Sequence, residues 1–136
     1  MRVSQKLDYA SRAMVHLARK HDGQSVVRAD DIAESEVIPP SFLAQILHEL
    51  KRMGLVTSRR GKTGGWKLNK DPSEISFLTV VEALEPEVLE SSSESSGDSG
   101  SSVSGLWEKV RESARSILAE NSLESMVSSE DPMFYI

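Results

Sequence analysis

The sequence of 136 residues contains no cysteine, and this absence excludes several kinds of chemistry. Disulfides, thiolate zinc sites, cysteine-ligated iron–sulfur clusters and cysteine nucleophiles all require the missing sulfur atom. Long apolar runs are absent as well, since no stretch reaches the ~18 residues that a membrane-spanning helix needs. The charges scattered over residues 1–8 are unlike a signal peptide. We therefore expect a soluble, cytoplasmic protein with no membrane partner and no cofactor held by the chain as written.

The charges are divided unequally along the chain. Residues 1–70 contain 13 of the 16 lysines and arginines but only 7 of the 21 aspartates and glutamates, for a net charge of +6. Residues 71–136 have a net charge of −11. The overall charge of −5 therefore conceals a basic half that is a candidate for binding a polyanion.

Apolar spacing and turn residues predict the elements of the basic half. The expected elements are helices at residues 4–20, 29–36, 40–53 and 76–84, and a hairpin with strands at 55–58 and 65–68. Pro39 and Pro40 separate the second helix from the third, because proline disfavours helical geometry in the residue before it. The hairpin encloses the basic, glycine-containing loop 59–64.

Residues 91–104 differ in kind, because nine of these fourteen residues are serine and one valine cannot anchor them. We expect them to form a mobile loop. Beyond it, an apolar stripe at helical spacing predicts a helix over 105–120. The chain would thus consist of a domain at 1–85, a serine-rich flexible loop at 86–104, and a helix with a C-terminal tail at 105–136.

The order of the elements in the basic half is that of a winged helix-turn-helix, a mainly α domain with a small β-hairpin wing (α+β). Its third helix would have an outward face that is free to enter the major groove of double-stranded DNA. Ser41 and Gln45, early in that helix, are the best base-reading candidates, whereas Lys51 and Arg52 suit phosphates. The candidate DNA-contacting residues are Lys6, Tyr9, Ser41, Gln45, His48, Arg52, Arg59, Arg60 and Lys62.

Other interpretations stay open at this point. A winged fold also occurs in modules that bind only proteins, and Tyr9 fits a half-buried core position as well as a phosphate contact. Trp66 is better explained by packing than by stacking on a base. Catalysis is not expected, because we find no nucleophile–base pair, no phosphate-cradling loop before a helix and no paired carboxylates with a clear pocket.

Several short motifs are distributed over residues 1–85 and resume at Leu106-Trp107. They are Ser4-x-Lys6-x-x-Tyr9-Ala10-x-Arg12-Ala13-Met14, Ile32-Ala33-Glu34, Phe42-Leu43-x-Gln45-Ile46-Leu47-x-x-Leu50, Met53-Gly54-Leu55-Val56, Arg60-Gly61-x-x-Gly64-Gly65-Trp66-x-Leu68, Ile75 and Val80-Val81-x-Ala83-Leu84-Glu85. In these motifs the sequence resembles the Rrf2 (Rrf-two) family of bacterial winged-helix transcription regulators. The resemblance implies a sequence-specific DNA-binding regulator, more often a repressor than an activator.

The resemblance also implies a homodimer, because the late helix of the family pairs with its mate from a second copy. The residues expected at this dimer contact are Leu106, Val110, Ile117 and Leu118. Packing of the same stripe within one chain is the alternative. A two-fold dimer would let two short winged domains read two half-sites.

Two departures from the family's pattern affect the expected function. Cluster-binding members carry three cysteines before the Leu-Trp pair, where this chain has the segment Ser91–Ser104, and serine is a poor iron ligand. An iron–sulfur cluster is therefore not expected, unless serines have replaced the cysteines of a natural sensor. Otherwise an unknown small molecule or protein would be the effector. The second departure is Ala44, where several relatives have an acidic base-reading residue, which indicates a different target site.

Overall fold

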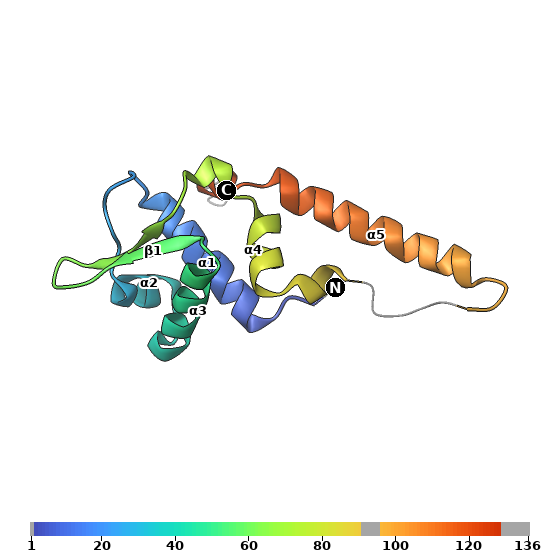
Figure 1. Ribbon diagram of the computed structural model, residues 1–136, viewed down its shortest axis with the longest axis horizontal. Helices are drawn as coiled ribbons and strands as arrows, with labels where there is room; N and C mark the ends of the chain where they lie inside the picture. Colours follow the sequence, from blue (N-terminus) through green and yellow to red (C-terminus); the bar gives the residue numbers. More distant parts are fainter. Residues whose placement is uncertain (1, 91–95, 129–136) are drawn as a thin grey trace, which may run out of the picture.

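The computed structural model describes residues 2–90 and 96–128. In chain order, this part forms α1 (Gln5–Arg19), α2 (Ala29–Glu36), α3 (Pro40–Arg52), β1 (Val56–Arg59), β2 (Gly65–Leu68), a 3-10 turn at Pro72–Glu74, α4 (Phe77–Leu84), a second 3-10 turn at Pro86–Leu89, α5 (Gly100–Glu120) and α6 (Leu123–Ser128). The hairpin projects from one end of the molecule and the N-terminal half of α5 from the opposite end (Figure 1). The expected fold class, a mainly α winged helix-turn-helix with a small hairpin, is confirmed.

Local capping residues set the ends of the helices in the winged domain. The Ser4 side chain accepts a hydrogen bond from the Leu7 N–H at the start of α1, and Ser76 does the same for Thr79 at the start of α4. Each bond satisfies a backbone donor that the helix itself leaves unpaired. Gly54 follows α3 with a φ of +82°, the left-handed conformation that ends a helix and that glycine adopts without steric cost.

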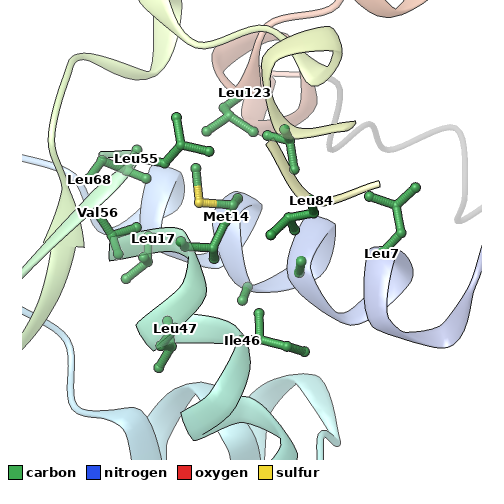
Figure 2. Close-up of a cluster of buried hydrophobic side chains, with 14 of the residues drawn as sticks. Leu7, Met14, Leu17, Ile46, Leu47, Leu55, Val56, Leu68, Leu84 and Leu123 are labelled. Atoms are coloured by element: carbon green, nitrogen blue, oxygen red, sulfur yellow. The ribbon is translucent and has the colours of Figure 1, made fainter. Parts of the chain in front are cut away.

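The hydrophobic core lies around α1, which packs against α2, α3, α4, α6 and β2. Figure 2 shows Met14 near the centre of this core, with Leu123 of α6 on one side and Leu47 of α3 on the opposite side. All three side chains are fully buried. Each side chain of this size contributes about 1.5–3 kcal/mol when it is removed from water, so these contacts fix the orientation of α3 relative to the rest of the domain.

The two strands of the wing pair antiparallel, with Val56 opposite Leu68 and Arg59 opposite Gly65. The connection between α1 and α2 adds a single bridge to this hairpin. The N–H of Val27 donates to the carbonyl oxygen of Trp66, and the N–H of Trp66 donates back to Val27, both at 2.7 Å. The base of the wing is therefore tied to the segment that precedes α2.

The serine-rich segment differs from its expected description as a loop over 86–104. Pro86–Leu89 forms a 3-10 turn in which Leu89 is buried, and α5 begins at Gly100 rather than at Gly105. Serine costs only a fraction of a kcal/mol per residue in a helix, and adding residues to an existing helix avoids the cost of nucleation. Residues 91–95 of the expected loop, and the tail residues 129–136, lie outside the described residues.

The end of the chain also differs from the expected tail. After α5 the chain returns to the winged domain, where the Leu123 N–H donates to Ile75 and the Phe77 N–H donates to Asn121, each at 2.9 Å. Leu123 is completely buried, and α6 packs against α1. Residues 121–128 thus complete the core of the winged domain instead of extending the C-terminal unit. Among the described residues, no helix is both long and apolar enough to cross a bilayer.

Candidate nucleic-acid interface

One face of α3 is committed to the core and the other is open. Leu43, Ile46, Leu47 and Leu50 are buried at helical spacing. The exposed residues of the helix include Ser41, Ala44, Gln45, His48, Lys51 and Arg52. The two base-reading candidates, Ser41 and Gln45, therefore lie on the open face and toward its N-terminal end.

The wing is held against α3 by two side-chain contacts. The Lys51 ammonium donates a hydrogen bond to the Ser58 hydroxyl on β1 at 2.8 Å. The rings of His48 and Trp66 meet edge to face, with centroids 5.4 Å apart and planes inclined at 82°. Such aromatic pairs favour a defined relative orientation. Helix and hairpin thus present their exposed residues as one surface.

Between α3, the wing and the start of α2 lies a groove of about 400 Å³ with several cationic side chains along it. Arg28, Lys51, Arg59 and Arg60 contribute to its lining. Arg28 donates to the carbonyl oxygen of Lys62 at 2.9 Å, and Arg59 donates to the carbonyl oxygen of Gln24 at 3.3 Å. A concentration of guanidinium and ammonium groups in one groove attracts anions such as DNA phosphates.

Two adjacent glycines allow close backbone contacts, one within the wing and one between the wing and the segment before α2. A Cβ at Gly64 would lie 2.1 Å from the carbonyl oxygen of Arg59, and a Cβ at Gly65 would lie 2.5 Å from that of Val27. No real Cβ approaches a backbone oxygen so closely, so only glycine permits these contacts. The glycines in the Arg60–Leu68 motif therefore have a structural purpose, which is to place the arginines of the tip.

The two expected DNA contacts on α1, Lys6 and Tyr9, are also engaged within the protein. The Lys6 ammonium forms an ion pair with Glu49 of α3 at 2.9 Å. The Tyr9 ring packs edge to face against Phe42 at 5.4 Å, and its hydroxyl accepts a hydrogen bond from Gln5 at 2.9 Å. Both side chains connect α1 to α3. A contact with DNA would be made in addition to these interactions.

Arg28 lines the groove but was not among the candidates from the sequence. It is a single arginine in an irregular connection, with no periodic pattern around it. The bridge between Val27 and Trp66, together with its own hydrogen bond to Lys62, brings Arg28 beside the wing. The nearest signal in the sequence is its position directly before α2, where a helix N-terminus also attracts anions.

A second surface lies on α5 and is apolar. Leu106, Trp107, Val110 and Ile117 are 55%, 57%, 49% and 61% exposed, and Leu106, Val110 and Ile117 are among the residues expected at the dimer contact. Leu118 differs from the other expected dimer residues, because it is half-buried and packs against the core of its own chain. Arg115 pairs with Glu82 of α4 at 3.1 Å, so the C-terminal half of α5 is fastened to the winged domain.

A helix-turn-helix with a wing and an appended long helix is a fold class of transcription regulators. Residues 3–129 match the Rrf2 family, described as iron-dependent transcriptional regulators, and the chain belongs to this family. It is 39% identical to an HTH-type transcriptional regulator of Mycobacterium tuberculosis, over 90% of this chain and 79% of that protein. It is 31% identical to CymR of Bacillus subtilis over the full length of both.

The structure is similar to that of CymR, the global cysteine regulator of B. subtilis, with a TM-score of 0.87 and 27% sequence identity over 96% of this chain and 99% of that one. The expectation that the protein is not an enzyme is confirmed by these relatives, which are transcription regulators.

The residues of this chain do not fit the iron named in the family's description. Cysteine is absent from the whole sequence. In residues 2–90 and 96–128, no group of three or more histidine, aspartate or glutamate side chains is arranged to hold a metal ion. His16 pairs with Glu36, and His48 packs against Trp66. Ser101 and Ser104, nearest to the family's ligand positions, are exposed on α5 and offer only hydroxyl groups.

Proposed function

We propose that the protein is a homodimeric, sequence-specific DNA-binding transcription regulator that works as a repressor in the cytoplasm. The observation that carries this proposal is the single surface formed by the open face of α3 and the basic groove beside the wing. The two parts of this surface suit duplex DNA. The major groove admits one α-helix, and an arginine at a hairpin tip can enter a narrow minor groove.

The parts of this surface have different tasks. Ser41 and Gln45, on the exposed N-terminal part of α3, read base edges. Arg28, Arg59 and Arg60 bind phosphates or enter the minor groove, which positions the helix without reading the sequence. Because the phosphate contacts displace counterions, affinity falls as salt concentration rises.

A titration of the protein on its own upstream DNA by fluorescence anisotropy, at two salt concentrations, tests the proposal. Arg60→Ala should weaken binding to all sequences and reduce the slope of log K against log salt by about 1. Gln45→Ala should weaken the specific site by about 1–3 kcal/mol and leave non-specific DNA unaffected. Lys70→Ala, which removes an exposed cation beyond the base of the hairpin, is the control. Unchanged binding by both Arg60→Ala and Gln45→Ala would falsify the recognition model.

The apolar stripe on α5 supports the proposal of a homodimer. Side chains as large as Leu106 and Trp107 are rarely left together on the surface of a monomer, and such a patch marks an interaction site. A two-fold contact through α5 buries the same stripe from both copies and places two α3 helices on one side of the dimer for two half-sites.

Repression requires no protein surface besides the one that binds DNA, because a dimer that occupies a promoter prevents RNA polymerase from binding there. In vitro transcription from the protein's own promoter should therefore decrease as the protein is added. We further propose that DNA binding is independent of an iron–sulfur cluster, since this chain has no thiolate to hold one. Affinity should be the same before and after treatment with an iron chelator under air.

A further inference from the structure

Another groove lies on the turn between α2 and α3, and we refer to it as the turn groove. Its volume is about 500 Å³. Two carboxylates of α2, Asp30 and Glu34, contribute to its lining. The other lining residues are apolar and come from α2, the turn and the start of α3: Ala33, Val37, Ile38, Pro39 and Pro40. An apolar groove that also carries charges is typical of a site for an amphipathic partner.

Val37 places an apolar side chain in the turn groove although this destabilises the free protein. The residue ends α2 in the left-handed conformation, with a φ of +55°. Glycine adopts this conformation without steric cost, whereas a β-branched residue is strained in it. Val37 is also 80% exposed, so an apolar partner that covers it would remove it from water. Strain and exposure together mark Val37 as a contact residue.

The two carboxylates determine which charge the partner must carry. Asp30 and Glu34 are exposed and lie on one face of α2, about 6 Å apart along the helix axis. Among the described residues, neither of them forms an ion pair. Carboxylates repel phosphates, so the turn groove is not an extension of the basic surface proposed to bind DNA. It suits a protein segment with two cationic side chains.

We propose that the turn groove is a docking surface for a basic amphipathic helix of a protein bound to the neighbouring DNA, an interaction beyond the proposed DNA binding. Amphipathic helices dock in apolar grooves through side chains that are three and four residues apart. Two cationic side chains at this spacing on the partner helix would pair with Asp30 and Glu34. An apolar side chain between them would cover Val37 and Pro39.

The position of the turn groove points to a partner on the same DNA. Asp30 lines both the turn groove and the basic groove, and Pro40 directly precedes the base-reading candidate Ser41. A helix in the turn groove would therefore lie next to the DNA that α3 contacts. Proteins that bind DNA carry cationic residues on the faces near it, and this is the charge that Asp30 and Glu34 require. The nearness to DNA rests on the proposed function, whereas binding of the helix itself does not.

Fluorescence anisotropy of a labelled peptide, titrated with the full chain in the absence of DNA, tests the docking surface. The probe is a helical peptide of about 15 residues with two arginines and one leucine on the same face. The control peptide has the same composition, but its leucine lies on the opposite face. The probe should bind about tenfold more tightly than the control, because only its leucine covers Val37. Equal binding of both peptides, or binding of neither, overturns the proposal.

Glu34→Gln removes one carboxylate and should weaken binding of the probe about threefold or more. The matched control is Asp31→Asn, which removes the same charge from the same helix outside the turn groove and should leave binding nearly unchanged. Equal losses in the two variants would indicate non-specific attraction and overturn the docking surface.

Val37→Gly tests the apolar contact without a risk to folding. It should weaken binding of the probe about tenfold, and it should not lower the urea midpoint of unfolding, because glycine relieves the strained backbone. A midpoint below that of the parent protein, or probe binding equal to that of the parent, overturns the role of Val37.

Affinity for the protein's own upstream DNA separates this proposal from the proposed function. Glu34→Gln and Val37→Gly should bind that DNA at least as tightly as the parent protein does, since neither change removes a contact with phosphates or bases. A loss of about tenfold would make the turn groove part of the DNA interface and overturn the docking surface. A parent protein that binds the probe but no DNA would overturn the proposed function and support the docking surface.

Discussion

The exposed faces of α3 and α5 have opposite chemistry, although α3 and the C-terminal half of α5 pack on the same core. The open face of α3 carries Ser41, Gln45 and Arg52, beside the cations of the wing. The open face of α5 carries Leu106 and Trp107. A polar, basic face is well solvated and can bind phosphates. An apolar face, in contrast, is stabilised when another apolar surface covers it and excludes water. The two helices are therefore suited to two different partners.

The two halves of α5 differ from each other as well. The C-terminal half is fixed by the Arg115–Glu82 ion pair and by the backbone bonds that lead into α6. In the N-terminal half, every residue from Ser101 to Val110 is exposed, and this half extends away from the domain (Figure 1). In the proposed dimer, the C-terminal half of α5 would connect the second copy to the winged domain that contains α3.

The largest expected effect is on the stability of the fold, and it distinguishes the buried face of α3 from its open face. Leu47→Ala removes a fully buried side chain and should lower the free energy of unfolding by about 2–5 kcal/mol, because a cavity is left in the core. Gln45→Ala, two residues away on the open face, should change it by less than about 0.5 kcal/mol. Urea unfolding followed by circular dichroism measures both. Equal effects would contradict the assignment of the two faces.

The next effect concerns the apolar face of α5. Val110→Glu places a charge in the middle of the stripe and should dissociate the proposed dimer, because a buried unpaired charge is costly. The measurement is the molar mass by light scattering, and affinity for a two-half-site DNA should fall about 100-fold or more as avidity is lost. Glu112→Gln, which removes a charge elsewhere on the same helix, is the control. A Val110→Glu variant that keeps the mass of a dimer would rule out this interface.

A smaller effect is expected at the wing. Gly64→Ala introduces a methyl group that would lie 2.1 Å from the Arg59 carbonyl oxygen, so the tip must move and its cations are displaced. DNA affinity should fall about tenfold, the loss of one or two phosphate contacts, while the helical content stays the same. Gly105→Ala is the matched control, since its Cβ meets nothing within 4 Å. If both variants bind DNA as the parent protein does, the wing makes no essential contact.

The smallest effect is a dependence of stability on pH that arises in the loop before α2. Hydrogen bonds from Ser25 and Gln24 lower the pKa of Asp22 from 3.8 to about 2. Because the folded-state pKa is depressed, this stabilisation is complete above pH ~4 and is lost as the pH falls through the folded value. The urea midpoint of Asp22→Asn should therefore vary less between pH ~4 and pH ~2 than that of the parent protein. Identical pH profiles would show that the loop is not ordered by Asp22.

Most of the helices, and the wing, followed from local signals in the sequence. Ser4, Gly54 and Ser76 mark helix ends through bonds or backbone angles that involve only their near neighbours, so the expected boundaries agree closely with those observed. The expectation failed at the start of α5, where serine and glycine composition suggested a loop. Composition gives only an average propensity. For serine the free-energy difference between loop and helix is small, so the neighbouring helical turns can decide the conformation.

The candidate interface was only partly accessible to sequence reasoning. Gln45 and His48 were correctly placed on the open side of α3, because the period of the buried leucines leaves no other position for them. Nothing in the sequence around Lys6 indicates that it pairs with Glu49. Nothing around Arg28 indicates that it lines the groove. Ion pairs and grooves join residues that are far apart in the chain, and a single sequence does not contain those distances.

The sequence by itself determined the type of each element in the winged domain and which face of α3 is open, because helical period, capping and glycine placement act over a few residues. It also determined that no thiolate can hold a cluster. Only the tertiary structure decided that Leu123 closes the core, that Leu118 packs on its own domain, and that His16, Asp22 and Asp31 line one cavity. Those contacts depend on how the helices pack, and packing brings together residues that the chain keeps apart.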